Sequence, residues 1–245
     1  MNTINLKTTG DEIEIYVNQL NDVLDIIWKD ENYGRQQPDR FYFILFLKLR
    51  SVIGSMNFHL QNLDAKRDFT VSLCLLLRTA MLDVLNVYYV MDSSDKTQEQ
   101  EYRINRLMAD HFKFEFKDYS DEEKDTIRQD WPELFELDGK QKKFEYLSSK
   151  KMVEEITNFE SLQREGSICR EVYMKLSKFE HNGAFTFDIL LAPYIPEQYP
   201  KVKSLIKVAI NSAVIGIRTL CDYWLTKDDL ISSKLTESVH KILKN

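Results

Sequence analysis

Glycine and proline are scarce in this sequence, with seven glycines and five prolines among 245 residues. Sandwiches and barrels of β-strands need frequent turns rich in these residues, so their scarcity argues against an all-β fold and favours long helices. Cysteine is scarce too, and Cys74, Cys169 and Cys221 are widely spaced. An odd number without a Cys-x-x-Cys pair predicts no disulfide framework. We therefore expect reduced thiols in a cytoplasmic protein.

Positive charge is also in deficit, because the formal net charge is −6 at pH 7. Such a balance gives no electrostatic reason to expect a nucleic-acid or anionic-membrane partner. The N-terminal sequence MNTINLKTTGDEIEIYV contains no apolar segment of the kind that a secretory signal carries. Hydrophobic residues make up 43% of the chain. They suffice for a full core, and we predict one all-α domain over residues 1–245.

Apolar residues recur at helical spacing through most of the chain. We predict helices over 9–28, 38–63, 69–90, 95–117, 120–131, 149–158, 160–181, 201–225 and 228–243. Thr9-x-x-Glu12 and Ser120-x-x-Glu123 have the spacing of capping boxes at helix starts. The pattern predicts an antiparallel bundle of seven to nine helices around 42–63, 69–90, 160–181 and 201–225. In the last of these, the small residues Ala209, Ala213 and Gly216 permit a close approach between helices.

Residues 95–158 differ from the rest, because charged residues of both signs are dense there and aromatic residues recur among them. Mixed charge is usual on a solvated helical face. The alternation in FKFEFKDY, residues 112–119, would also suit a short strand. We interpret 95–158 as a charged helical insert or a peripheral helical layer on the bundle.

The segment 69–90 is apolar and of helix length, yet it contains Arg78 and Asp83. At about 100° per residue, Arg78 shares a face with apolar neighbours. These neighbours are Val71, Leu75, Leu82, Leu85 and Tyr89. A guanidinium stays protonated and needs an acceptor, so an arginine in the core would mark a polar site.

The same segment is about long enough to cross a membrane. Arg78, Asp83 and Asn86 near its middle would be costly to place in lipid. We therefore expect a buried central helix and no membrane partner.

A second polar group lies on the segment 160–181, where Arg170, Ser177 and His181 are spaced seven and four residues apart. This spacing places them within about 40° of one another around a helix, with Tyr173 and Glu180 beside them. One interpretation is a catalytic site in which Arg78 holds an anion, His181 is the acid or base, and Ser177 or Tyr173 donates a hydrogen bond. Asp83, Arg170, Tyr173 and Glu180 are the candidate binding residues.

The alternative is structural. In this interpretation His181 caps a helix C-terminus, where the helix dipole favours a cation, and Arg78 forms a buried pair with Glu180 or another carboxylate. The four histidines are scattered, and the sequence has neither a phosphate-binding loop nor a dinucleotide-binding motif. We expect no metal and no cofactor.

Arg78 and Asp83 in LLLRTAMLDVLNVYYV, with Tyr173-x-x-x-Ser177-x-x-x-His181, resemble a group of bacterial all-helical proteins of unknown function. That group is similar in layout to HEPN-type helical bundles, which include RNases and toxin or abortive-infection proteins. The resemblance implies a site at Arg78, Asp83, Ser177 and His181. The nuclease motif of an arginine four to six residues before the histidine is absent here, since Arg170 precedes His181 by eleven.

Two functions are compatible with these observations. The first is a non-enzymatic interaction module in bacterial regulation or phage defence, with a second copy of the chain, another protein or a small anionic ligand as partner. The second is a HEPN-like hydrolase or nuclease that uses Arg78 and His181. The negative net charge disfavours nucleic acid as its substrate.

Overall fold

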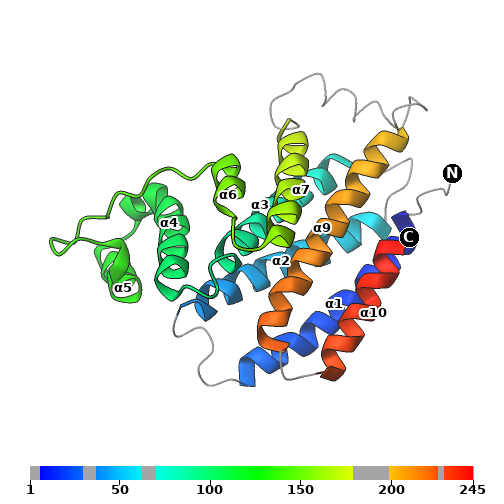
Figure 1. The fold of residues 1–245 in the computed structure, drawn as a ribbon, viewed down its shortest axis with the longest axis horizontal. Helices are drawn as coiled ribbons and strands as arrows, with labels where there is room; N and C mark the ends of the chain where they lie inside the picture. The colour runs from blue at the N-terminus through cyan, green and yellow to red at the C-terminus, as the bar shows by residue number, and fades with distance from the viewer. Residues whose placement is uncertain (1–5, 30–36, 62–69, 179–198, 226–228, 245) are drawn as a thin grey trace.

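The computed structural model describes residues 6–29, 37–61, 70–178, 199–225 and 229–244. These residues form nine α-helices and two short 3-10 helices, and no strand lies among them (Figure 1). The helices are α1 (Leu6–Lys29), α2 (Asp39–Gln61), α3 (Thr70–Met91), α4 (Thr97–Glu115), η1 (Phe116–Asp118), α5 (Asp121–Asp130), η2 (Pro132–Leu134), α6 (Ser149–Glu155), α7 (Glu160–Ser177), α9 (Tyr199–Leu225) and α10 (Asp229–Lys244). The predicted all-α helical bundle is confirmed.

Helix α3 lies at the centre of the bundle and packs against α2, α4, α6, α7 and α9. Helix α1 packs against α2, α9 and α10 (Figure 1). The buried side chains of α3 include Leu73, Cys74, Leu77, Ala80, Met81, Val84, Leu85, Val87, Tyr88 and Tyr89. So many buried positions in one helix follow from its contacts with neighbours on several sides.

Helices α3 and α9 approach each other closely at Gly216. A Cβ atom added there would lie 3.0 Å from the Val84 Cβ and closer still to the two Val84 methyl groups. Ala209 and Ala213, which precede Gly216 along α9, are fully buried. The predicted close approach along these small residues is therefore confirmed, and its shape leaves no room for a larger side chain at residue 216.

Residues 97–147, which we call the lobe, stand to one side of the bundle (Figure 1). The lobe consists of α4, η1, α5, η2 and the non-helical segment 135–147. Helix α4 packs against α3, and α5 packs against η2. The predicted insert 95–158 also included α6, but α6 packs against α3 and α7 and thus belongs with the bundle.

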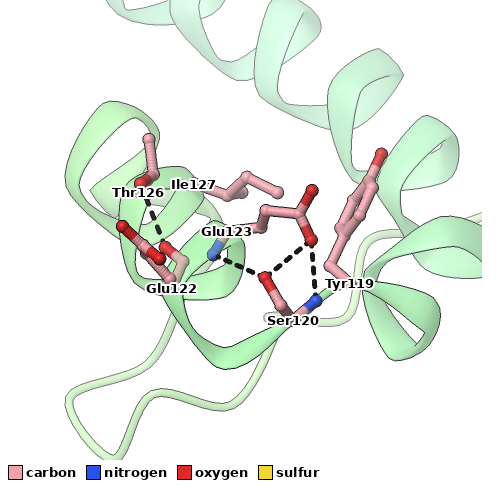
Figure 2. Close-up of a pocket in the computed structure, with 6 residues that line it drawn as sticks. All are labelled: Tyr119, Ser120, Glu122, Glu123, Thr126 and Ile127. Carbon is pink, nitrogen blue, oxygen red and sulfur yellow. Dashed lines mark hydrogen bonds between the residues drawn. The ribbon is translucent and has the colours of Figure 1, made fainter.

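Two local predictions fail and one holds. The capping box at Thr9 is wrong, because α1 begins at Leu6 and Thr9 is buried inside it. The strand alternative for 112–119 is wrong as well, because this segment continues α4 into η1. The Ser120 capping box is confirmed at the start of α5. Figure 2 shows Glu123 N donating to Ser120 Oγ, while Ser120 N donates to the Glu123 carboxylate at 2.8 Å.

Three helical segments are long and apolar enough to cross a membrane, judged by length and composition alone. They are Asp39–Gln61, Val71–Met91 and Lys201–Leu225.

The three cysteines are buried in the bundle as thiols and form no disulfide with one another. Burial raises the pKa of Cys169 to about 12, and it also raises the pKa of Cys221. Thiols so far from ionisation are poor nucleophiles, so they act as apolar core residues.

Candidate functional site

The structure brings Arg78 of α3 next to two of its predicted companions on α7. Arg78 Nε donates a hydrogen bond to Ser177 Oγ at 3.1 Å, and Ser177 Oγ donates to the carbonyl oxygen of Tyr173 at 2.8 Å. The Arg78 guanidinium lies over the Tyr173 ring, with Cζ 5.4 Å from the ring centroid. We call Arg78, Tyr173 and Ser177 the seam centre, because it lies where α3 and α7 pack together.

The prediction that Arg78 occupies a core position is wrong. Arg78 is only half-buried, and Leu75, one turn earlier on its face, is 38% exposed. The fully buried side of α3 is centred on neighbouring positions such as Leu77 and Met81. Apolar residues surround α3 on nearly all sides, so the sequence pattern did not single out the face that the bundle buries.

Arg170 lies on α7, seven residues before Ser177, and it is half-buried. Its Nε is shielded from solvent and donates no hydrogen bond within the described part of the chain. Spacing places Arg170 on the same side of α7 as Tyr173 and Ser177. Glu180 and His181, the remaining predicted members of this site, lie outside the described residues.

Asp83 does not join the seam centre. It lies five residues after Arg78, about 140° further around α3, and faces α2. Its Oδ1 accepts a hydrogen bond from Lys48 Nζ at 2.8 Å. Asp83 is 2% exposed, and its Oδ2 has no hydrogen-bond partner among the described residues. Burial raises the pKa of this carboxyl, and the opposing effect of Lys48 does not cancel the increase.

A larger group of buried charges lies at the base of the lobe, and it includes Arg103 on α4. Arg103 Nη1 donates to the Tyr89 carbonyl oxygen at 2.6 Å and to Asp92 Oδ2 at 3.2 Å. Its Nη2 donates to Glu99 Oε1 at 2.6 Å and to the Glu155 carbonyl oxygen at 2.9 Å. The guanidinium also lies 4.7 Å from the centroid of the Tyr89 ring. One arginine thus ties α4 to the ends of α3 and α6.

Arg106, one turn further along α4, has a similar set of partners. Its Nη1 donates to both carboxylate oxygens of Glu155, at 3.1 and 2.9 Å, and to the Tyr89 hydroxyl at 3.3 Å. Its Nε donates to the Glu145 carbonyl oxygen at 2.9 Å. Burial lowers the pKa of Arg106, but the hydrogen bonds with Glu155 and Tyr89 outweigh it, and the net shift is upward. Arg106 therefore stays charged at 3% exposure.

Asp92 completes this group at the end of α3. Its Oδ1 accepts hydrogen bonds from the backbone N–H groups of Asn158 and Phe159, both at 2.9 Å, and its Oδ2 accepts one from Thr157 at 3.0 Å. These N–H groups lie just before α7, where the helix dipole stabilises a negative charge. Asp92 is fully buried and also pairs with Arg103. We call Tyr89, Asp92, Arg103, Arg106 and Glu155 the lobe anchor.

Sequence reasoning missed the lobe anchor because its members come from three separate segments and lie partly in the charge-rich region. One signal was present: Glu99, Arg103 and Arg106 are spaced four and three residues apart, and therefore share one face of α4. Because these positions are charged and not apolar, the sequence pattern gave no sign that the face is buried, and it resembled a solvated face.

Several cavities are lined by described residues, and three of them bear on the search for a site. One lies along α10, from Leu230 to His240, with a volume of about 670 Å³. A second, of about 530 Å³, lies at the start of α5, and Figure 2 shows its lining. The polar groups of Ser120 and Glu123 there already bond to each other in the helix cap. The third, of about 470 Å³, lies on the lobe and includes Arg106 in its lining.

No group of three or more metal-binding side chains occurs among the residues that the structure describes. Comparisons with protein-family models, with curated proteins and with solved structures find no significant match for this chain. The seam centre, the lobe anchor and the lobe surface are therefore the features from which a function can be inferred.

Proposed function

We propose that this chain is a non-enzymatic interaction module of the bacterial cytoplasm, which acts in regulation or phage defence through the surface of its lobe. One observation carries the proposal. The lobe stands to one side of the bundle (Figure 1), is fixed to it by a buried network of charges, and displays large apolar side chains.

The lobe anchor supports this function because it makes the attachment of the lobe specific. Arg103 and Arg106 bond to carboxylates and carbonyl oxygens at the ends of α3 and α6, so α4 can take only one position on the bundle. Removal of Arg103 would leave the buried Asp92 carboxylate without its cationic partner. A protein that displays a binding surface on a projecting part benefits from such a fixed attachment, since less freedom is then lost on association.

The exposed side chains of the lobe are of the kinds that interfaces use. Tyr102 is 49% exposed, Tyr146 is 71% exposed, and Leu137 is fully exposed. The ring of Tyr102 lies 6.1 Å from that of Phe144, so aromatic side chains gather on this part of the lobe. Tyrosine is enriched in protein interfaces because it buries a large area and retains a polar hydroxyl. These side chains support a protein partner, either a second copy of the chain or another protein.

A hydrolase that uses Arg78 and His181 is the second candidate, and the seam centre is the observation that favours it. Arg78, Tyr173 and Ser177 meet at the junction of α3 and α7, where an anion holder and hydroxyl donors would be needed. Against it, Arg78 Nε and Ser177 Oγ already bond within the protein. The resemblance to HEPN-type bundles supports the same region of the chain.

The proposal of a cytoplasmic location is supported by charge inside the apolar helices. Lys48 of α2 pairs with Asp83 of α3, and Arg218 of α9 pairs with Asp222. Such residues are costly within a lipid bilayer. The three apolar helices bury part of their surface against one another, which a helical bundle in water also requires.

The test compares variants of the lobe surface with variants of the hydrolase site in bacteria that express the chain and are challenged with phage. We expect the double substitution Leu137→Ser and Tyr146→Ser to abolish protection. Arg78→Ala and His181→Ala should leave protection intact. Leu230→Ser, at a leucine of α10 that is 66% exposed, is the matched control for loss of surface apolar area.

Purified variants must retain the melting temperature of the wild type by circular dichroism, so that loss of fold is separated from loss of function. Loss of protection in folded Arg78→Ala and His181→Ala, with the lobe variant still active, would establish the hydrolase instead. Absence of protection by the wild type itself would contradict the defence role.

A further inference from the structure

The cavity on the lobe is built like a site for a small ligand. It lies between α4 and the segment 141–147, and its volume of about 470 Å³ is in the range of small-molecule sites, roughly 300–1,000 Å³. Its lining includes Arg106, Lys142, Lys143, Phe144, Tyr146 and Leu147. Cationic and apolar side chains therefore face the same space.

Arg106 is the element of this lining that points to a ligand. The side chain is 3% exposed, and its Nε and Nη1 are satisfied by Glu145, Glu155 and Tyr89. Its Nη2, however, donates no hydrogen bond within the described protein. A buried guanidinium N–H group without an acceptor is costly, so such a group usually has a ligand or a water as its partner.

The carboxylate of Glu145 does not fill this role. Glu145 Oε2 lies 3.8 Å from Arg106 Nη2, which is too long for a hydrogen bond. The Glu145 side chain is 69% exposed, and its other oxygen pairs with Lys151. The hydrogen bond from Lys151 lowers the pKa of Glu145, so this carboxylate is charged at neutral pH. Glu145 is therefore a charged neighbour of Arg106 Nη2 that accepts no hydrogen bond from it.

The remaining lining indicates what would fill that position. Lys142 is half-buried and Lys143 is exposed, and neither forms an ion pair among the described residues. Two such ammonium groups beside a guanidinium favour an oxyanion, which can accept from the arginine and remain near both lysines. Phe144, Tyr146 and Leu147 supply apolar surface for the rest of the molecule.

We propose that this cavity binds a small oxyanion, a carboxylate or a phosphate monoester, that carries an aromatic or aliphatic group. One oxygen accepts from Arg106 Nη2 once the exposed Glu145 side chain has moved aside, a second lies near Lys142 and Lys143, and the apolar group packs against Phe144 and Leu147. This ligand site goes beyond the proposed function, since it does not depend on what protein the lobe surface contacts.

The test is a titration of the ¹⁵N-labelled full chain with benzoate, phenyl phosphate and the neutral benzamide, followed by amide chemical shifts. We expect one or both anions to shift amides of α4 and of 141–147, with affinity at least about tenfold above that of benzamide. Equal binding of benzamide, shifts confined to other parts of the chain, or no shifts at about 10 mM anion would each overturn the proposal.

Variants separate the site from general electrostatics. The double substitution Lys142→Glu and Lys143→Glu should weaken anion binding by about tenfold or more. The matched control Lys117→Glu with Lys150→Glu makes the same change in net charge on exposed lysines outside the cavity, and should change binding less than about twofold. Equal weakening by both doubles would contradict a built site.

Weaker binding in a variant could also result from misfolding, so a variant that is expected to bind more tightly is included. Glu145→Gln removes the negative charge beside Arg106 Nη2 and should tighten anion binding several-fold. Weaker binding in this variant would contradict the placement of the oxyanion.

Discussion

The two arginine sites of this protein differ in depth and in partners. Arg78, in the bundle, is half-buried and contacts a serine hydroxyl and a tyrosine ring. Arg103 and Arg106, at the base of the lobe, are 4% and 3% exposed and bond to the carboxylates of Asp92 and Glu155, respectively. The two most deeply buried arginines among the described residues therefore both pair with carboxylates.

The two regions are also held together differently. The bundle joins α3 to α9 through close apolar packing at Gly216 and Val84. The lobe is joined to the bundle through the charged groups of the lobe anchor in addition to buried apolar residues such as Ile104. Substitutions at the two junctions should therefore lower the free energy of unfolding by different amounts.

The largest effect is expected at Asp92. Asp92→Ala removes the acceptor of three backbone N–H groups before α7 and leaves Arg103 without one of its buried carboxylates. Breaking a buried charge pair in this way costs about 3–5 kcal/mol, so we expect a loss of this size in the free energy of unfolding. Urea denaturation followed by circular dichroism measures it.

The control is Asp130→Ala, which breaks the solvent-exposed pair with Arg40. Exposed ion pairs contribute about 0–1 kcal/mol, so this variant should stay near the wild type. If both variants lost the same amount, depth of burial would not be what distinguishes the lobe anchor.

The next effect concerns the packed junction. Gly216→Ala places a methyl group against Val84, and overpacking of this kind costs about 1–3 kcal/mol. Gly54→Ala is the matched control on α2, since nothing lies within 4 Å of its added Cβ. Alanine there should stabilise the protein by about 0.5–1 kcal/mol through its helix propensity. Thermal melts of the two variants should shift in opposite directions, and a shift in the same direction would contradict the close approach of α3 and α9.

A smaller loss is expected at the seam centre. Ser177→Ala removes a hydroxyl that accepts from Arg78, and a hydrogen bond of this kind contributes about 0.5–1.5 kcal/mol. Because Arg78 is half-buried, water can replace the hydroxyl, so the loss in unfolding free energy should lie at the low end. A loss as large as that of Asp92→Ala would show that the seam centre is as tightly built as the lobe anchor.

The last prediction concerns how the free energy of unfolding changes with pH. Burial raises the pKa of Asp83 in the folded protein above its ordinary value of 3.8, so the folded state holds this proton more tightly than the unfolded state. The contribution of Asp83 to stability is therefore full below pH 3.8 and is lost as pH rises through the raised pKa. Asp83→Asn should flatten this part of the pH dependence of unfolding. An unchanged profile would contradict the raised pKa.

The sequence predicted the helices better than it predicted the polar sites. Helix spacing follows from apolar periodicity, which is local, and the predicted bounds of 160–181 and 201–225 lie close to those of α7 and α9. Proximity of Arg78 to Ser177 was also accessible, since both lie beside apolar faces that must pack together. The degree of burial of Arg78 could not be predicted from the sequence, because α3 is apolar on nearly every side.

The lobe anchor could not be predicted from local sequence patterns, for a different reason. Asp92, Arg106 and Glu155 come together only through the tertiary arrangement of α3, α4 and α6, and each lies among other charged residues in the sequence. A charge that will be buried against a distant carboxylate has the same local surroundings as one that will face water. Only the packing of the helices separates the two.

The most direct test compares two double-mutant cycles in urea denaturation. One combines Arg103→Met with Asp92→Asn, and the other combines Arg78→Met with Ser177→Ala. A coupling energy of about 2–3 kcal/mol for the first pair and below about 1 kcal/mol for the second is predicted by the difference in burial. Equal coupling energies in the two cycles would contradict the conclusion that buried charge fixes the lobe to the bundle.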